Sequence, residues 1–145
     1  MAKFNFRLQN FLGIKEKLER QKEIEYGLAI QQLNAEKQKL SDMMEEREFC
    51  ITEFQVKISK RIDPETFKRY NDYIEVMKIG IKAQELEMWK AQEFANKKHK
   101  ELIKAMQERK AMEKLRERAF EEFTENEKLE EKRINDDLVT LMYAK

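Results

Sequence analysis

The chain has 145 residues, of which 41% are charged and 41% hydrophobic, yet it contains only three Gly and one Pro. So few turn-forming residues argue against a globule of many short elements, and so many apolar residues argue against a disordered chain. The charge is nearly balanced, with 30 Lys and Arg against 29 Asp and Glu, so no overall field favours nucleic acid or an anionic membrane.

The first predicted helix covers about residues 6–60. From Tyr26 onward its residues recur at alternating steps of four and three, which is the spacing of a coiled-coil seam. Upstream, the apolar residues keep helical spacing but not this phase, so we expect a stutter near Gly27. The expected seam positions are Tyr26, Ile30, Leu33, Lys37, Leu40, Met44, Arg47, Ile51, Phe54 and Ile58, and the apolar positions upstream are Leu8, Phe11, Ile14, Leu18, Ile24 and Leu28.

A break is predicted at about residues 61–63, because the residue before a proline is pushed out of the helical region. Asp63 is suited to cap the next helix, Pro64 to occupy its first position, and Glu65 to favour its positive end. The second predicted helix therefore covers about residues 64–142. Its seam keeps one register, with positions Phe67, Tyr70, Ile74, Met77, Ile81, Gln84, Met88, Ala91, Ala95, Lys98, Leu102, Ala105, Arg109, Met112, Arg116, Ala119 and Phe123.

Two consecutive seams joined by a short break most simply fold onto each other, because closing a short loop costs little entropy. We predict an all-α protein in which residues 1–145 form one antiparallel coiled-coil hairpin, whose longer second helix overhangs by roughly two dozen residues. The alternative is an extended helix that dimerises in parallel, which the Asp63-Pro64 break disfavours. Facing residue numbers should add to about 125. Phe54 would then meet Asn71, Met44 would meet Ile81, and Leu8 would lie near Glu117.

Residues that could carry out chemistry are scarce and isolated. His99 is the single histidine and stands among lysines, and neither Ser41 nor Cys50 has a base within helical reach. No glycine-rich loop could hold a phosphate, and a two-helix hairpin has no pocket to desolvate a carboxylate. We therefore expect no enzymatic activity, no metal and no cofactor. The single cysteine suits a reducing compartment, and no stretch has the ~20 apolar residues that cross a bilayer, so we expect a cytoplasmic protein.

The charge reverses in the second helix. Residues 97–118 contain nine Lys or Arg against four acids, and residues 119–137 contain eight acids against three bases. Solvated i,i+4 pairs explain this pattern, and the alternative is a basic collar that docks on an acidic protein surface. Nucleic-acid binding is a weaker third interpretation, because the interspersed acids would repel phosphates.

A second apolar stripe lies on the outer side of the second helix, away from its seam. Scattered apolar residues are normal on a surface, but a contiguous stripe is typical of a partner site. Its members are Val76, Ile79, Ala83 and Leu86, with Tyr73 and Gly80 at the border and Trp89 at one end. A C-terminal run lies on the overhang, where the first helix cannot cover it, and consists of Ile134, Leu138, Val139, Leu141, Met142 and Tyr143.

The opening pattern Phe4-x-Phe6-x-Leu8-x-x-Phe11-Leu12, followed by a charged helix with Leu18, Leu28, Ala29 and Leu33, resembles the flagellar export protein FliJ family. The resemblance continues through the Asp-Pro break into Tyr70-x-x-Tyr73-Ile74-x-x-Met77-x-x-Gly80-Ile81 and covers essentially the whole chain. It implies a component of the flagellar type III export apparatus, similar in shape to the central stalk of rotary ATPases.

The resemblance also implies partners. They are the hexameric flagellar export ATPase, the cytoplasmic domain of the export gate protein FlhA and unloaded export chaperones, at the flagellar base and with membrane association only through the gate. By this resemblance the gate-binding positions map to Tyr73, Met77, Gly80 and Gln84, and the outer stripe adds Val76, Ile79 and Ala83. For the ATPase we expect the free ends of the hairpin, because only they carry an overhang and a charge reversal. The expected residues are Phe4, Phe6, Leu8, Phe11, Arg109, Arg116, Phe120, Phe123, Leu138, Leu141 and Met142.

Two other functions fit the same pattern. A coiled-coil chaperone would shield unfolded clients with the outer stripe and the overhang, and a structural rod would dimerise. Suppression of client aggregation would indicate the first, and a stable dimer the second.

Overall fold

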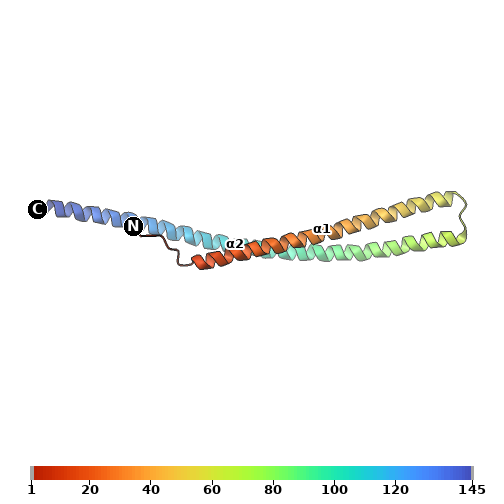
Figure 1. Cartoon of the computed structure of the whole chain (residues 1–145), viewed down its shortest axis with the longest axis horizontal. Helices are drawn as coiled ribbons and strands as arrows, with labels where there is room; N and C mark the ends of the chain where they lie inside the picture. The colour runs from red at the N-terminus through yellow and green to blue at the C-terminus, as the bar shows by residue number, and fades with distance from the viewer. Residues whose placement is uncertain (1, 145) are drawn as a thin grey trace. The chain divides into compact units, whose positions relative to one another are not determined.

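The computed structural model describes residues 2–144, which form two long helices, α1 (Gln9–Ser59, 51 residues) and α2 (Pro64–Tyr143, 80 residues). The helices pack against each other in antiparallel directions, and the second is longer, as predicted (Figure 1). α1 begins at Gln9, later than the expected residue 6, because the segment before it is not helical. The Gln9 amide donates a hydrogen bond to the Phe6 carbonyl, at 3.1 Å, where the helix begins.

A side-chain cap lies at the end of the turn, where α2 begins. Asp63 accepts hydrogen bonds from the side chain and the backbone amide of Thr66, which hold the pKa of Asp63 below its ordinary value of 3.8. The Phe67 amide donates to the Asp63 carbonyl at 3.1 Å, closing the first turn. The predicted cap is therefore confirmed, and its carboxylate is ionised at neutral pH.

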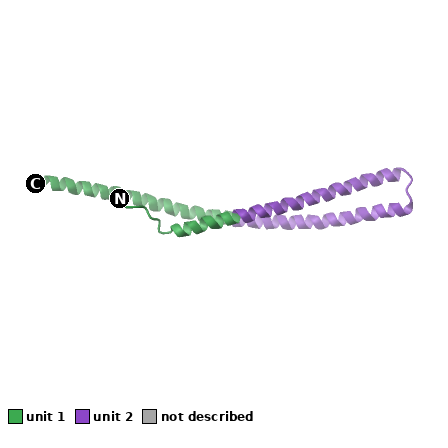
Figure 2. Ribbon diagram, in the orientation of Figure 1, with its two compact units in different colours: residues 1–22, 102–145 green, residues 23–101 purple. Residues whose placement is uncertain are grey.

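The chain divides into two compact units, and each contains a segment of both helices (Figure 2). Unit 1 comprises residues 1–22 and 102–145, and unit 2 comprises residues 23–101. In the part of the chain that the structure describes, no helix is long and apolar enough to cross a membrane.

Unit 2 has an alanine-rich core. Ala29, Leu33 and Ala95 are buried together, and Ile30, Met88 and Ala91 pack against them. Small side chains at such positions let two helix backbones approach closely. Near the turn, larger residues fill the seam. The Phe54 ring lies 5.3 Å from the Phe67 ring and 5.5 Å from the Tyr70 ring.

Unit 1 is held by a few buried apolar residues and by several ionic contacts between the helices. Leu12, Ala105 and Phe6 are buried, and so is Glu19, which pairs with Arg109. Along α1, the seam positions between Leu12 and Ala29 include charged residues, so this part of the interface depends on polar contacts more than the core of unit 2 does.

The register agrees with the expected pairing. Gln9 bonds to Arg116 and the Tyr26 ring lies 5.0 Å from the His99 ring, two pairs whose residue numbers add to about 125. The α2 seam is also confirmed, since every predicted position between Tyr70 and Met112 is buried or half-buried. Phe67 and Arg116, near its two ends, are exposed by comparison.

Most of the predicted seam positions of α1 are buried or half-buried, but Lys37, Met44 and Ile58 are exposed. Leu33, Leu40 and Phe54 lie in the seam, but Glu36 and Met43 take the places expected for Lys37 and Met44. The facing residues explain the change: Gln84 bonds to Glu36, and the Met43 side chain fills the space beside Gly80.

The expected stutter near Gly27 is wrong. The buried or half-buried positions run at steps of four and three from Leu8 to Leu33 without a break. They are Leu8, Leu12, Lys15, Glu19, Lys22, Tyr26, Ala29 and Leu33. The apolar residues that suggested a change of phase, Phe11, Ile14, Ile24 and Leu28, are exposed instead. Ion pairs to α2 stabilise polar residues in this part of the seam, and a count of apolar residues misses them.

Candidate protein-binding surfaces

The outer side of α2 in unit 2 carries a run of exposed apolar residues, which we call the outer stripe. Val76 is 62% exposed and Ile79 is 67% exposed, so neither is used in the packing of the two helices. A face of this kind lacks the cover that a third helix would provide and is suited to a protein partner. The outer stripe consists of Tyr73, Val76, Ile79, Ala83, Leu86 and Trp89.

Tyr73 lies at the edge of the outer stripe, where its hydroxyl donates a hydrogen bond to Glu46 of α1 at 3.4 Å. The Glu46 carboxylate raises the pKa of Tyr73 above its ordinary value of 10.0, because a phenolate there would face a second negative charge. The phenol is therefore protonated at neutral pH and presents both a ring and a polar tip to a partner.

Three of the expected gate-binding residues belong to the helix interface rather than the open surface. Gln84 is 5% exposed and donates hydrogen bonds to the backbone carbonyl of Glu36, at 3.1 Å, and to its carboxylate. Met77 is half-buried in the seam. Gly80 is half-buried, and a methyl group added there would lie 3.3 Å from the tip of Met43. The residues open to a partner are therefore Tyr73, Val76, Ile79 and Ala83.

In unit 1, an aromatic cluster holds the segment before α1 on the surface of α2. The Phe4 ring lies 5.2 Å from the Phe120 ring and 5.5 Å from the Phe123 ring. The Arg116 guanidinium stacks over Phe4 at 5.7 Å from the ring centroid. The segment thus covers the part of the α2 seam that lies beyond the start of α1. Its own Phe6 side chain is buried.

The two arginines expected to bind the ATPase are engaged within unit 1. Arg109 bonds to Glu19 across the helix interface and to Glu113 at 2.8 Å along α2, and both contacts raise its pKa above its ordinary value. Arg116 donates to the side-chain oxygen of Gln9 at 3.2 Å. These contacts order the free ends of the hairpin, and Arg116 remains exposed enough to meet a partner.

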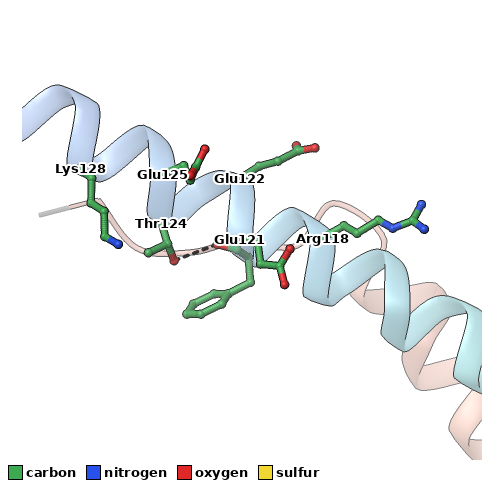
Figure 3. A pocket seen from close by; sticks show the side chains of 7 residues that line it. Arg118, Glu121, Glu122, Thr124, Glu125 and Lys128 are labelled. Carbon is green, nitrogen blue, oxygen red and sulfur yellow. Dashed lines mark hydrogen bonds between the residues drawn. The ribbon is translucent and has the colours of Figure 1, made fainter.

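Beyond the aromatic cluster, α2 continues without a neighbouring helix. Every described residue from Lys128 to Ala144 is exposed, including the expected Leu138, Leu141 and Met142. An open hollow of about 640 Å³ lies at the start of this overhang beside Phe120, and three glutamates, Arg118 and Lys128 line it. Figure 3 shows the carboxylates of Glu121, Glu122 and Glu125 projecting from the helix there. A long exposed helix end with apolar and acidic residues is suited to binding another protein.

Residues that could carry out chemistry remain apart in the structure. The described residues contain no group of His, Cys, Asp and Glu that could hold a metal ion. His99 lies against Tyr26, and Cys50 is half-buried with a free thiol.

A comparison with protein families matches residues 4–145 to the family described as Flagellar FliJ protein. The chain belongs to the FliJ family. Searches of curated proteins and of solved structures gave no match. The resemblance seen in the sequence is confirmed over essentially the whole chain. The family is a non-enzymatic component of the flagellar export apparatus.

Sequence reasoning missed one feature of this FliJ-family chain, the aromatic cluster around Phe4. The first helix was expected to begin at about residue 6, with no structure predicted for Phe4, whereas both Phe4 and Phe6 precede α1. The available signal was their alternation, since residues two apart point the same way in an extended segment and not in a helix.

Proposed function

We propose that the chain is a central-stalk-like coiled coil of the export apparatus that binds two partners with two different surfaces. The outer stripe binds the cytoplasmic domain of the gate protein FlhA, and the free ends of the hairpin in unit 1 enter or cap the ring of the export ATPase. In this role the protein escorts unloaded export chaperones and works at the cytoplasmic side of the flagellar base.

The observation that carries this proposal is the exposure of the outer stripe, together with membership of the FliJ family. The helix pair already buries its own seam, so the outer stripe is not needed for folding. Tyr and Trp residues beside exposed aliphatic ones are enriched in protein interfaces. Tyr73 and Trp89 stand at the two ends of the outer stripe in this way.

The free ends supply the second surface. The overhang offers apolar side chains that no residue of α1 covers, beside a hollow lined by acidic and basic residues. The Phe4 cluster keeps the segment before α1 ordered next to it. Two helices side by side are roughly 20 Å wide, which suits the central opening of a ring.

Binding to the purified gate domain tests the first surface. We expect Val76→Asp to weaken binding about tenfold or more, because a carboxylate would have to be buried without a partner in the interface. Val56→Asp is the matched control, since Val56 is also more than half exposed but lies on α1 outside the outer stripe. Circular dichroism should show full helicity for both variants. Equal affinity of the two variants for the gate domain would exclude the outer stripe as the binding surface.

Removal of residues 128–145 tests the second surface. This truncation keeps Phe120 and Phe123, so the aromatic cluster with Phe4 stays intact. We expect the shortened chain to lose binding to the ATPase ring and stimulation of its activity, while its affinity for the gate domain is unchanged. If the shortened chain binds and stimulates the ATPase as well as the full chain does, the overhang is not the contact.

A further inference from the structure

A hollow opens beside the turn of the hairpin in unit 2, next to the outer stripe. Its volume is about 550 Å³, and its lining joins α1 to the first turns of α2. Two cations and two phenols face it, an arrangement that can bind a carboxylate and an apolar group together. The lining residues are Lys57, Thr66, Arg69, Tyr70 and Tyr73.

The surroundings of this hollow are basic. Residues 57–69 contain five Lys or Arg against two acids. One of those acids, Asp63, is already used as the helix cap by Thr66. A net positive charge is therefore concentrated around the turn.

The two cations of the hollow differ in how far they are compensated. Lys57 donates to the Tyr70 hydroxyl at 2.5 Å and lies 4.0 Å from the Glu53 carboxylate. Arg69 forms no hydrogen bond or ion pair with another described residue, although its charge stabilises the ionised Asp63 at longer range. Lys57 is thus held in place as part of the wall, while the Arg69 guanidinium, with its fork of donors, is available to a ligand.

The hollow is continuous with one edge of the outer stripe. Arg69, Tyr73, Val76, Gly80 and Ala83 follow one another at steps of four, three, four and three, so they form a single row along α2. At the next two steps stand Glu87 and Lys90, which pair with each other at 3.4 Å. At one end of the row, Glu87 and Lys90 neutralise each other. At the other end, Arg69 has no ion-pair partner among the described residues.

We propose that this hollow receives a carboxylate side chain from an acidic segment of the gate's cytoplasmic domain, which lies along the row with its acidic end toward the turn. The inference rests on the proposed binding of the gate to the outer stripe and adds the charge and direction of the bound segment. Arg69 forms a bidentate contact with the carboxylate, and Tyr73 packs against the apolar residues that follow it.

A protein segment fits this surface better than an anionic membrane does. Glu46 and Glu53 of α1 lie beside Tyr73 and Lys57, and Glu65 lies at the start of α2. These acids would repel a continuous layer of lipid phosphates, whereas one carboxylate can approach Arg69 between them.

Binding of the gate domain to charge-reversed variants tests the inference. We expect Arg69→Glu to weaken binding about tenfold and to flatten its dependence on salt. Lys68→Glu is the matched control, because it changes the net charge equally on the adjacent residue, outside the lining of the hollow. This control should bind within about twofold of the natural chain. Arg69→Gln should show an intermediate loss, and circular dichroism should show unchanged helicity for all three variants.

The possible results distinguish this inference from the proposed binding of the gate to the outer stripe. If Val76→Asp weakens binding and Arg69→Glu does not, the outer stripe binds the gate but the hollow receives no carboxylate. If neither variant changes the affinity, the gate does not bind this face at all. If Arg69→Glu and Lys68→Glu weaken binding equally, the effect is one of general charge and the hollow is not a specific site. Binding of vesicles containing anionic phosphatidylserine, lost in Arg69→Glu while gate affinity stays constant, would assign the hollow to a lipid surface and overturn the inference.

Discussion

The phase of the α1 seam can be tested with two leucines that lie less than two turns apart. Leu33 is 4% exposed in the core of unit 2, whereas Leu28 is 60% exposed. Leu33→Ala removes about three methylene equivalents from the core, worth ~0.8 kcal/mol each, so the transfer contribution is about 2.4 kcal/mol. Because the neighbours are small alanines at the edge of a thin structure, the cavity collapses or fills with water and adds little. We expect the free energy of unfolding to fall by about 2–3 kcal/mol.

Leu28→Ala is the matched control for this substitution. The same atoms are removed from the same helix, but most of the side chain is already in water, so the expected loss is below about 1 kcal/mol. Urea unfolding of the full chain, followed by far-ultraviolet circular dichroism, measures the loss of unfolding free energy for both variants. The dependence of this free energy on urea concentration should be the same for both. Equal losses for the two variants, or a larger loss for Leu28→Ala, would show that the seam passes through Leu28, and the reasoning from burial would be refuted.

Two further predictions concern unit 1. Lys15 lies 3.0 Å from Glu108 and holds the pKa of Glu108 below its ordinary 4.5, so this contact stabilises the fold above pH 4.5 and is lost as the pH falls through the lowered pKa. The protection factors of the amides in residues 9–22, which correct for the intrinsic pH dependence of exchange, should therefore fall on acidification. Glu108→Gln should lower them already at neutral pH and show a weaker response to acid. Phe4→Ala should release the segment before α1 and make it sensitive to limited proteolysis, whereas Phe11→Ala should not, because Phe11 is exposed and outside the aromatic cluster. Equal cleavage of the two phenylalanine variants would show that the cluster does not hold the segment.

Much of the fold follows from local rules that the sequence satisfies. The Asp63-Pro64 step ends one helix and caps the next through contacts within four residues, so it can be recognised without tertiary information. The α2 seam was equally clear, because its apolar and small residues keep one period over many turns. The outer stripe was visible for the same reason, since the residues opposite a well-defined seam must face away from it.

The exposure of the candidate binding residues was predicted less completely than the fold. Val76 and Ile79 could be placed on the outside from the period of α2 alone, and the structure has them exposed. Gln84 could not be excluded from the surface in that way, because a polar residue at a seam position is buried only if the facing helix supplies a partner. Glu36 is that partner, and it lies far away in the sequence.

The amino-acid sequence alone indicated the family. It also predicted the two long helices, the position of the turn between them and the antiparallel register. These features depend on helical period, capping and proline geometry, all of which act between near neighbours. Which side of α1 faces α2 depends on contacts between the helices, since Glu19 and Lys15 can replace apolar residues in the seam when Arg109 and Glu108 lie opposite them. The tertiary structure also decided that the segment around Phe4 folds back on α2, because aromatic contacts to Phe120 and Phe123 outweigh one more helical turn. The physical reason is the same in both cases: contacts between residues distant in sequence can stabilise a polar seam residue or an extended segment that local preferences do not favour.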